Sequence, residues 1–172
     1  MEHQGQISIR PTTNTTRESD GRWLKVALVC SHGGHLTEMQ MLSPAFEGCE
    51  CILITYRCSR TEELTQWPRK YLLSNIGTNI VRMIKAFVQA TRILLREQPD
   101  VVLSTGAEIA IPFLWVGRLL GARTIYVESW CRVRTRSGTG PLVYPIADLF
   151  LVQWPDMVRW YGSKARYLGG LI

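Results

Sequence analysis

The stretch SHGGHLTEM, residues 31–39, places two histidines and two adjacent glycines where an apolar run gives way to a helical pattern. Glycine adopts positive φ and lets the backbone approach a ligand closely, so Gly33 and Gly34 can shape a binding loop. The N-terminus of the following helix favours phosphate near Ser31 and these glycines. His35 lies at the mouth of the loop, where an imidazole can act as a general base. The alternative is a plain strand-to-helix turn that needs glycine only for its geometry.

A second candidate loop is the stretch STGAE, residues 104–108, which continues directly into a predicted helix. Thr105 and Gly106 are residue types that cap helices, and capping is one interpretation of this pattern. The other is that their O–H and N–H groups are donors to a sugar or a phosphate.

A third candidate loop is the stretch ESWCRVRTRSGTG, residues 128–140. Its alternating arginines, Arg132 and Arg134 among them, can bind a diphosphate bidentately, or they can simply form a solvated basic loop. Glu128 ends an apolar strand, so its carboxylate is expected to point into the same cleft. There it would serve as an acid/base or hydroxyl-binding group, or pair with a neighbouring arginine.

A zinc site is the other chemistry that these side chains allow. Its ligands would come from His32, His35, Cys49, Cys51 and Cys58. These cysteines lack a paired C-x-x-C spacing, so we predict that the chain binds no metal. The cysteine count of five is odd and does not suggest a disulfide framework, and residues 1–22 lack the apolar segment of a secretory signal. We therefore expect a protein of the reducing cytoplasm.

Short apolar runs alternate with helical patterns, and they predict the elements that must position these loops. Strands are predicted at residues 23–30, 49–56, 70–73, 100–105, 123–129, 148–153 and 165–170. Helices are predicted at residues 36–46, 76–97 and 107–120, and a short one from residue 155. Apolar strands interleaved with helices predict an α/β fold, a Rossmann-like parallel sheet with helices on both faces. All three polar loops then follow the carboxyl ends of strands, where such sheets bind ligands.

The composition fits one globular domain, because 46% of the 172 residues are hydrophobic and 20% are charged. We place this domain at residues 23–172 and predict that residues 1–22, which are rich in polar residues, form a disordered tail. The net charge of +6 favours an anionic partner, namely nucleic acid, a phosphate-bearing substrate or an acidic membrane surface. No apolar run reaches the roughly 18 residues that a spanning helix needs.

The predicted long helix carries a basic face that can meet anionic headgroups. On a wheel of about 100° per residue, four basic residues fall within about 80° of one another: Arg82, Lys85, Arg92 and Arg96. Five apolar residues lie on the other side: Ile80, Ile84, Phe87, Leu94 and Leu95. A solvated face over a buried one explains this pattern, and so does contact with a membrane.

Five stretches carry a resemblance to known proteins: SHGGHLTEM, PDVVLSTGAEIAIP, LGARTIYVES, YPIADLFLVQWPDM and ARYLGG. Their order and spacing resemble bacterial capsular and exopolysaccharide biosynthesis glycosyltransferase subunits of the PssD/EpsE type. Those proteins are similar to the asparagine-linked glycosylation protein fourteen subunit of the eukaryotic two-chain UDP-N-acetylglucosamine transferase. A more distant similarity is to the amino-terminal half of MurG, a single-chain glycosyltransferase of the GT-B fold. The resemblance covers residues 24–172.

The resemblance implies the acceptor-binding and membrane-docking subunit of a two-chain glycosyltransferase, inactive alone. A small partner subunit would hold the UDP-sugar, so this chain is expected to bind no cofactor. The acceptor would be a polyprenyl-diphosphate-linked saccharide in exopolysaccharide or capsule synthesis, at the cytoplasmic side of the inner membrane, with peripheral attachment. The glycine loop would face the acceptor diphosphate, His35 would match a loop histidine proposed as the base, and Glu128 would correspond to an acceptor-side glutamate.

Two other functions are compatible with these residues. One is a self-sufficient small Rossmann-like enzyme, such as a hydrolase using His35 and Glu128, although the chain has no nucleophile elbow or metal triad. The other is a basic nucleic-acid-binding module, but the arginines are spread over a helix and a loop, and no recognised motif is present. We therefore expect no nucleic-acid partner. Tight, salt-sensitive DNA binding without lipid association would favour the nucleic-acid-binding module.

Overall fold

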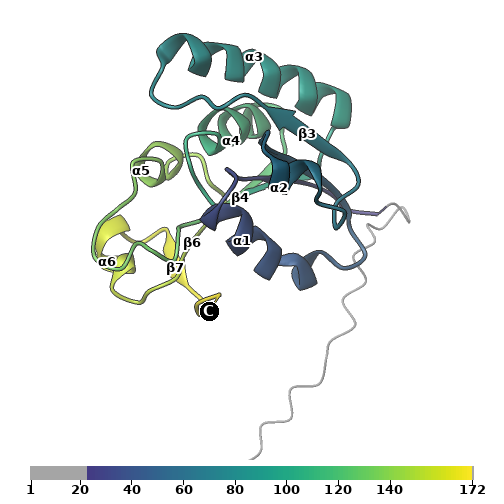
Figure 1. Ribbon diagram of the computed structural model, residues 1–172. Coiled ribbons are helices and arrows are strands. Elements are labelled where there is room, and N and C mark those ends of the chain that lie inside the picture. Colours follow the sequence, from purple (N-terminus) through teal and green to yellow (C-terminus); the bar gives the residue numbers. More distant parts are fainter. Residues whose placement is uncertain (1–22, 172) are drawn as a thin grey trace, which may run out of the picture.

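The structure, a computed structural model, describes residues 23–171 as a parallel sheet with helices packed on both faces (Figure 1). The strands are β1 (Lys25–Val29), β2 (Glu50–Tyr56), β3 (Lys70–Leu73), β4 (Val101–Ser104), β5 (Arg123–Val127), β6 (Leu149–Val152) and β7 (Ala165–Tyr167). The helices are α1 (Gly34–Met41), α2 (Ser59–Glu62), α3 (Ile80–Glu97), α4 (Ala110–Leu119), α5 (Gly140–Val143) and α6 (Met157–Tyr161), with a 3₁₀ turn η1 (Ser43–Phe46). The predicted tail, residues 1–22, lies outside the described residues.

The seven strands pair in the order β3-β2-β1-β4-β5-β6-β7, and every neighbouring pair is parallel. The chain moves outward from β1 to β3, then returns to place β4 on the other side of β1. The strand order therefore reverses between β1 and β4, and the carboxyl ends of these two strands flank the position where such sheets bind ligands. This topology confirms the predicted Rossmann-like sheet.

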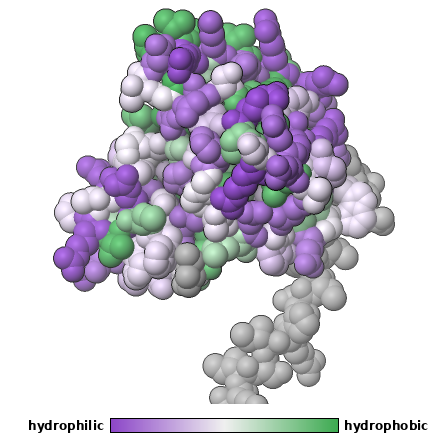
Figure 2. Space-filling model, viewed as in Figure 1, coloured by the Kyte–Doolittle hydropathy of each residue, from purple (hydrophilic) through white to green (hydrophobic). Residues whose placement is uncertain are grey.

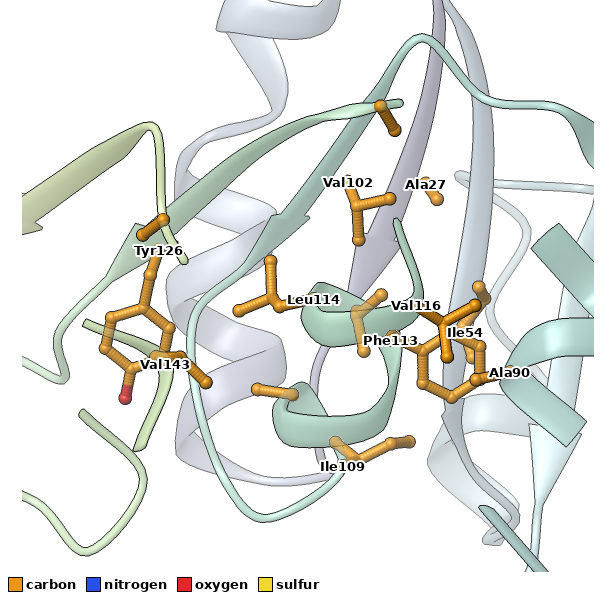
Figure 3. Close-up of a cluster of buried hydrophobic side chains, with 14 of the residues drawn as sticks. Ala27, Ile54, Ala90, Val102, Ile109, Phe113, Leu114, Val116, Tyr126 and Val143 are labelled. Atoms are coloured by element: carbon orange, nitrogen blue, oxygen red, sulfur yellow. The ribbon is translucent and has the colours of Figure 1, made fainter. Parts of the chain in front are cut away.

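Each face of the sheet has its own hydrophobic core, because successive strand residues point to opposite sides. On one face, Leu36 and Met39 of α1 pack with Val26, Leu28 and Leu53 of the strands. On the other face, α3 and α4 cover the sheet. Figure 3 shows residues of α4 among strand and α3 side chains in this second core: Phe113, Leu114 and Val116 beside Ala27, Ile54, Ala90 and Val102.

The helix boundaries differ from the predicted ones for local reasons. The helix predicted at residues 36–46 is split into α1 and η1, because Pro44 has no N–H to continue the α-helical hydrogen bonds. Helix α3 begins at Ile80 rather than residue 76, where the Asn79 side chain caps it by accepting from the Arg82 N–H at 3.0 Å. Helix α4 begins three residues later than predicted, since Gly106 and Ala107 have positive φ. The short helices α2 and α5 were not predicted.

Helix α3 buries much less of its apolar surface than the sequence pattern indicated. Its buried residues are Ala86, Ala90, Ile93, Leu94 and Glu97. Its exposed apolar residues are Ile80 (71% exposed), Val81, Ile84 (59% exposed), Val88 and Leu95. The basic residues Arg82, Lys85, Arg92 and Arg96 are exposed as well. Of the five apolar residues that the wheel places opposite the basic ones, Leu94 is buried, whereas Ile80, Ile84 and Leu95 are exposed.

We call the five exposed apolar residues of α3 the apolar stripe. At about 100° per residue, this stripe lies between the buried side of the helix and the four basic residues. Figure 2 shows hydrophobic and strongly hydrophilic surface next to one another at the top of the molecule, where Figure 1 places α3. The helix thus presents an uncovered apolar surface and a basic surface side by side.

Candidate functional site

A cleft of about 740 Å³ lies at the carboxyl ends of β1, β4 and β5. Ser31 lines it from the loop after β1, His35 from the first turn of α1, and Ala107 from the loop after β4. Arg132 and Ser137 line it from the loop after β5. The three polar loops singled out in the sequence therefore meet in one place, at the point where the strand order reverses.

His35 is held between the first two loops. Its backbone carbonyl accepts a hydrogen bond from the Thr105 hydroxyl at 2.7 Å. Its imidazole lies directly over Gly106, where an added Cβ would be 2.8 Å from Cε1. The side chain keeps 27% of its surface exposed to the cleft, although Nδ1 is buried. The second loop thus orients the histidine and leaves part of its ring open to a ligand.

Replacing Gly106 by alanine should displace His35 and destabilise the fold. The new methyl group would overlap the imidazole, and the φ of 127° at this position is strained for any residue with a Cβ. We expect a loss of about 1–3 kcal/mol in the free energy of unfolding, measured by urea denaturation. Gly138→Ala is the control, because nothing lies within 4 Å of the position that a Cβ would take there, and a loss of the same size would contradict this explanation.

The predicted loop residues have different roles in the structure. Gly33 adopts a φ of 106°, whereas Gly34 is the first residue of α1 and its φ is not positive. Positive φ was expected at both glycines, and it is needed only at Gly33. Thr105 is fully buried and uses its hydroxyl on His35, so it does not face the cleft as a donor. Gly106 shapes the wall behind the imidazole.

Glu128 does not point into the cleft. Only 1% of it is exposed, and its carboxylate accepts hydrogen bonds from the Ser129 N–H at 2.9 Å and the Ser137 hydroxyl at 2.8 Å. The Tyr161 hydroxyl is a third donor. Burial raises the pKa of Tyr161 and of the neighbouring Tyr126, and the Glu128 charge raises both further, so these phenols stay protonated. Glu128 therefore stabilises the third loop by accepting hydrogen bonds from its residues Ser129 and Ser137.

This placement corrects the expectation from sequence that the Glu128 carboxylate reaches the cleft. The end of a strand fixes where a residue lies but not which neighbours take its oxygens, and here the donors are up to 33 residues away. The hydrolase alternative relied on His35 and Glu128 acting together. Because the Glu128 carboxylate is buried away from the cleft, this alternative lacks its second catalytic group.

The two arginines of the third loop are separated. Arg132 lines the cleft, whereas Arg134 lines a neighbouring pocket together with Asp156, Arg159 and Trp160. The chain bends at residues 133–135, so alternate residues do not share one side as they would in a strand. Of the proposed diphosphate clamp, only Arg132 lines the cleft in this structure.

Three charged residues at the site were missed. Arg60 of α2 donates to the Gly33 carbonyl at 3.3 Å and to the Thr37 hydroxyl at 3.0 Å, so it braces the glycine loop. Glu108 lines the cleft and accepts from the Tyr56 hydroxyl at 2.9 Å. Glu38 lines it too and is almost fully buried. The sequence offered a signal only for Glu38, because it lies one turn after His35 on the same helix.

The described residues contain no cluster of three or more His, Cys, Asp or Glu side chains arranged to hold a metal ion. All five cysteines are free thiols, and burial raises the pKa of Cys30 to about 12. Within residues 23–171, no helix has the length and apolar character needed to cross a bilayer.

Comparison with known families identifies the relatives of this chain. The model of the family described as "Oligosaccharide biosynthesis protein Alg14 like" matches residues 68–171, which include the second and third cleft loops. The chain belongs to the Alg14-like family. The Alg14 part of the resemblance found in the sequence is thereby confirmed.

The relatives of this Alg14-like chain include UDP-N-acetylglucosamine transferase subunits of animals. The mouse (Mus musculus) subunit ALG14 is 29% identical over 195 residues, covering 92% of this chain and 86% of the mouse protein. The human (Homo sapiens) subunit ALG14 is 34% identical over 124 residues, covering 68% of this chain and 53% of the human protein. The matched segment thus spans about half of the human relative. The PssD/EpsE part of the resemblance stays a prediction.

Solved structures confirm the fold of the Alg14-like chain. MurG of Acinetobacter baumannii superposes with a TM-score of 0.71 at 18% identity, covering 86% of this chain and 45% of that one. The UDP-GlcNAc 2-epimerase of Methanocaldococcus jannaschii superposes with a TM-score of 0.65 at 16% identity, covering 86% and 46%. The chain therefore has the fold of somewhat less than half of each of these proteins.

Proposed function

We propose that this Alg14-like chain is the acceptor-binding subunit of a two-chain glycosyltransferase. The enzyme transfers N-acetylglucosamine from UDP-N-acetylglucosamine to a polyprenyl-diphosphate-linked saccharide. The observation that carries the proposal is the cleft at the point of strand reversal, which both His35 and Arg132 line in a chain of this family. The names of the mouse and human relatives, transferase subunits for this sugar, support the choice of donor.

The cleft has the chemistry to bind such an acceptor. The N-terminus of α1 follows the glycine loop directly, and its free N–H groups favour a phosphate there. Arg132 also lines the cleft and adds a positive charge, and a guanidinium can bind a phosphate oxygen pair. His35 then takes the proton of the acceptor hydroxyl as that oxygen attacks the sugar.

The donor is proposed to lie on a small partner subunit, so this chain itself binds no cofactor. The likeness to MurG covers less than half of that chain, and the mouse and human relatives are named as subunits. We also propose that the acceptor saccharide belongs to exopolysaccharide or capsule synthesis. The enzyme would then work at the cytoplasmic side of the inner membrane.

Reconstitution tests this division of labour. The purified chain is mixed with the candidate donor-binding subunit from the same organism, and transfer of radiolabelled N-acetylglucosamine to a polyprenyl-diphosphate saccharide is measured. We expect transfer only when both chains are present, because a cleft for the acceptor alone does not hold the nucleotide sugar. Full transferase activity from the isolated chain would contradict the proposal.

Helix α3 is proposed to be the surface that meets the membrane. The apolar stripe supplies side chains for insertion below the headgroups, at about 1.5–3 kcal/mol for each isoleucine or valine fully buried. The basic residues Arg82, Lys85, Arg92 and Arg96 add about 1 kcal/mol each near an anionic surface. An uncovered apolar surface beside a basic one matches an anionic lipid bilayer on both counts.

Replacing Ile80, Ile84 and Val88 together by serine should abolish binding to vesicles of phosphatidylcholine and phosphatidylserine. These side chains are exposed, so thermal unfolding should be nearly unchanged while sedimentation with vesicles is lost. Raising the salt concentration should weaken binding of the unaltered chain only in part, since insertion is not screened. Binding that survives the triple substitution but disappears in salt would assign attachment to the basic residues alone.

A further inference from the structure

Glu38 of α1 is a buried carboxylate that joins the first cleft loop to the third. Only 5% of it is exposed. Its Oε1 accepts hydrogen bonds from the Ser129 hydroxyl and from the Trp130 N–H, both at 2.9 Å. These donors lie more than 90 residues further along the chain, so the carboxylate is fixed from outside its own helix.

The second oxygen of Glu38 faces His35. Oε2 and the imidazole Nδ1 are 3.6 Å apart, both atoms are buried, and neither has a hydrogen-bond partner among residues 23–171. Buried polar atoms in native proteins are nearly always paired, because an unpaired one loses its water without compensation. The two atoms are therefore each other's available partner, and a small side-chain adjustment closes the gap, as happens when a ligand fills such a site.

The imidazole is not free to turn away from this carboxylate. Gly106 lies against its Cε1 edge, and the Thr105 hydroxyl holds the His35 backbone. With Nδ1 directed at Glu38, Nε2 is the nitrogen that remains for a ligand in the cleft. A histidine whose Nδ1–H is donated to a carboxylate has its basic lone pair on Nε2.

We infer that Glu38 is a positioning residue for His35: it accepts the Nδ1 proton and keeps Nε2 unprotonated and directed into the cleft. Its catalytic consequence rests on the proposed function. In the transfer step, Nε2 takes the proton of the acceptor hydroxyl while that oxygen bonds to the anomeric carbon of the UDP-sugar. The bond from that carbon to the diphosphate oxygen breaks, and UDP leaves with its electron pair. Glu38 then faces the imidazolium and stabilises it.

The tautomer of His35 tests the inference without any assay of activity. The full chain is labelled with ¹⁵N-histidine, and the ring nitrogens are observed by NMR at alkaline pH, where free imidazole is neutral. His32 is one of the three histidines of the chain, and it serves as an internal control because the ion pair with Glu38 involves His35. We expect a protonated Nδ1 and an unprotonated Nε2 at His35. A protonated Nε2 in the unaltered chain would overturn the inference.

Glu38→Gln changes the expected tautomer while keeping the size of the side chain. Its amide oxygen continues to accept from Ser129 and Trp130, so the NH₂ group faces Nδ1 and donates to it. Nδ1 must then be unprotonated and Nε2 protonated, the wrong form for a base. His32 should not change. A His35 spectrum that is identical in this variant would also overturn the inference.

Ser129→Ala is the matched control, because it removes one hydrogen bond to Glu38 and leaves the carboxylate. It should keep the tautomer of the unaltered chain, and its spectrum also decides the question if Glu38→Gln does not fold. Retention of Nδ1–H in Ser129→Ala supports the inference, and its absence there contradicts it.

With the partner subunit present, Glu38→Gln should lower kcat about 10²- to 10⁴-fold with little change in the KM for the acceptor. A switched tautomer with unchanged kcat would overturn the catalytic part of the inference. If the unaltered two-chain mixture shows no transfer while the tautomer switches as expected, the proposed function fails and the positioning of His35 by Glu38 stands.

Discussion

Replacing His35 by alanine should lower kcat of the proposed two-chain transferase about 10²- to 10⁴-fold, the range typical for loss of a general base. The imidazole is the basic group that the structure holds at the cleft wall, with Nδ1 buried and part of the ring exposed. In the proposed function the α1 N-terminus and Arg132 bind the acceptor, so the KM for the acceptor should change much less. Steady-state kinetics with the acceptor varied at saturating UDP-sugar measure both constants.

Met41→Ala is the control for His35→Ala. Met41 ends the same helix, is well exposed and does not line the cleft, so its loss should leave kcat unchanged. Near-normal turnover of His35→Ala would remove this histidine from the chemistry. A large rise in KM with kcat preserved would show that it positions the acceptor instead.

Replacing Glu128 by alanine should lower the free energy of unfolding by about 3 kcal/mol, since it leaves several buried donors without an acceptor. The affected donors are the hydroxyls of Ser137 and Tyr161 and the N–H of Ser129. For a chain of this size, the corresponding fall in melting temperature is about 10 °C. Calorimetry or thermal circular dichroism measures it.

Two variants separate this structural role from a catalytic one. Glu63→Ala removes an exposed carboxylate and should not change the melting temperature. Glu128→Gln keeps one acceptor oxygen and the packing, so its stability should lie between those of Glu128→Ala and the unaltered chain. A Glu128→Ala chain that melts normally but no longer supports transfer would return Glu128 to the cleft, where the sequence had placed it.

The long helix illustrates what a periodic pattern can predict. The 3.6-residue period predicted that the helix exists and that its basic residues lie on one side. Helix α3 ends at Glu97, as expected. The pattern did not show that Ile80, Ile84 and Leu95 are uncovered. A helical wheel separates apolar from charged residues, but only the position of α4 and the sheet decides how wide a strip of the helix is covered.

The carboxylates of the site show the same limit. Glu128 was expected in the cleft and is buried beneath it, whereas Glu38 and Glu108 line the cleft and were not singled out. Ser129 and Trp130 meet Glu38 across more than 90 residues of sequence, and Tyr56 meets Glu108 across 52. No pattern within one segment contains such pairs.

The elements that local chemistry controls could be predicted from the residues alone. Apolar runs set the seven strands, their alternation with helices set a parallel sheet, and the glycines and polar residues after β1, β4 and β5 marked the edge that holds the cleft. These features depend on side-chain type and short-range spacing, which a sequence displays directly.

Which side chains act together at that edge became clear only from the folded arrangement of the loops. It separated Arg132 from Arg134, placed Gly106 against His35, and set the free oxygen of Glu38 opposite Nδ1. The direction of a side chain and the partner of a buried oxygen depend on contacts between distant segments. These contacts form only when the helices pack on the two faces of the sheet.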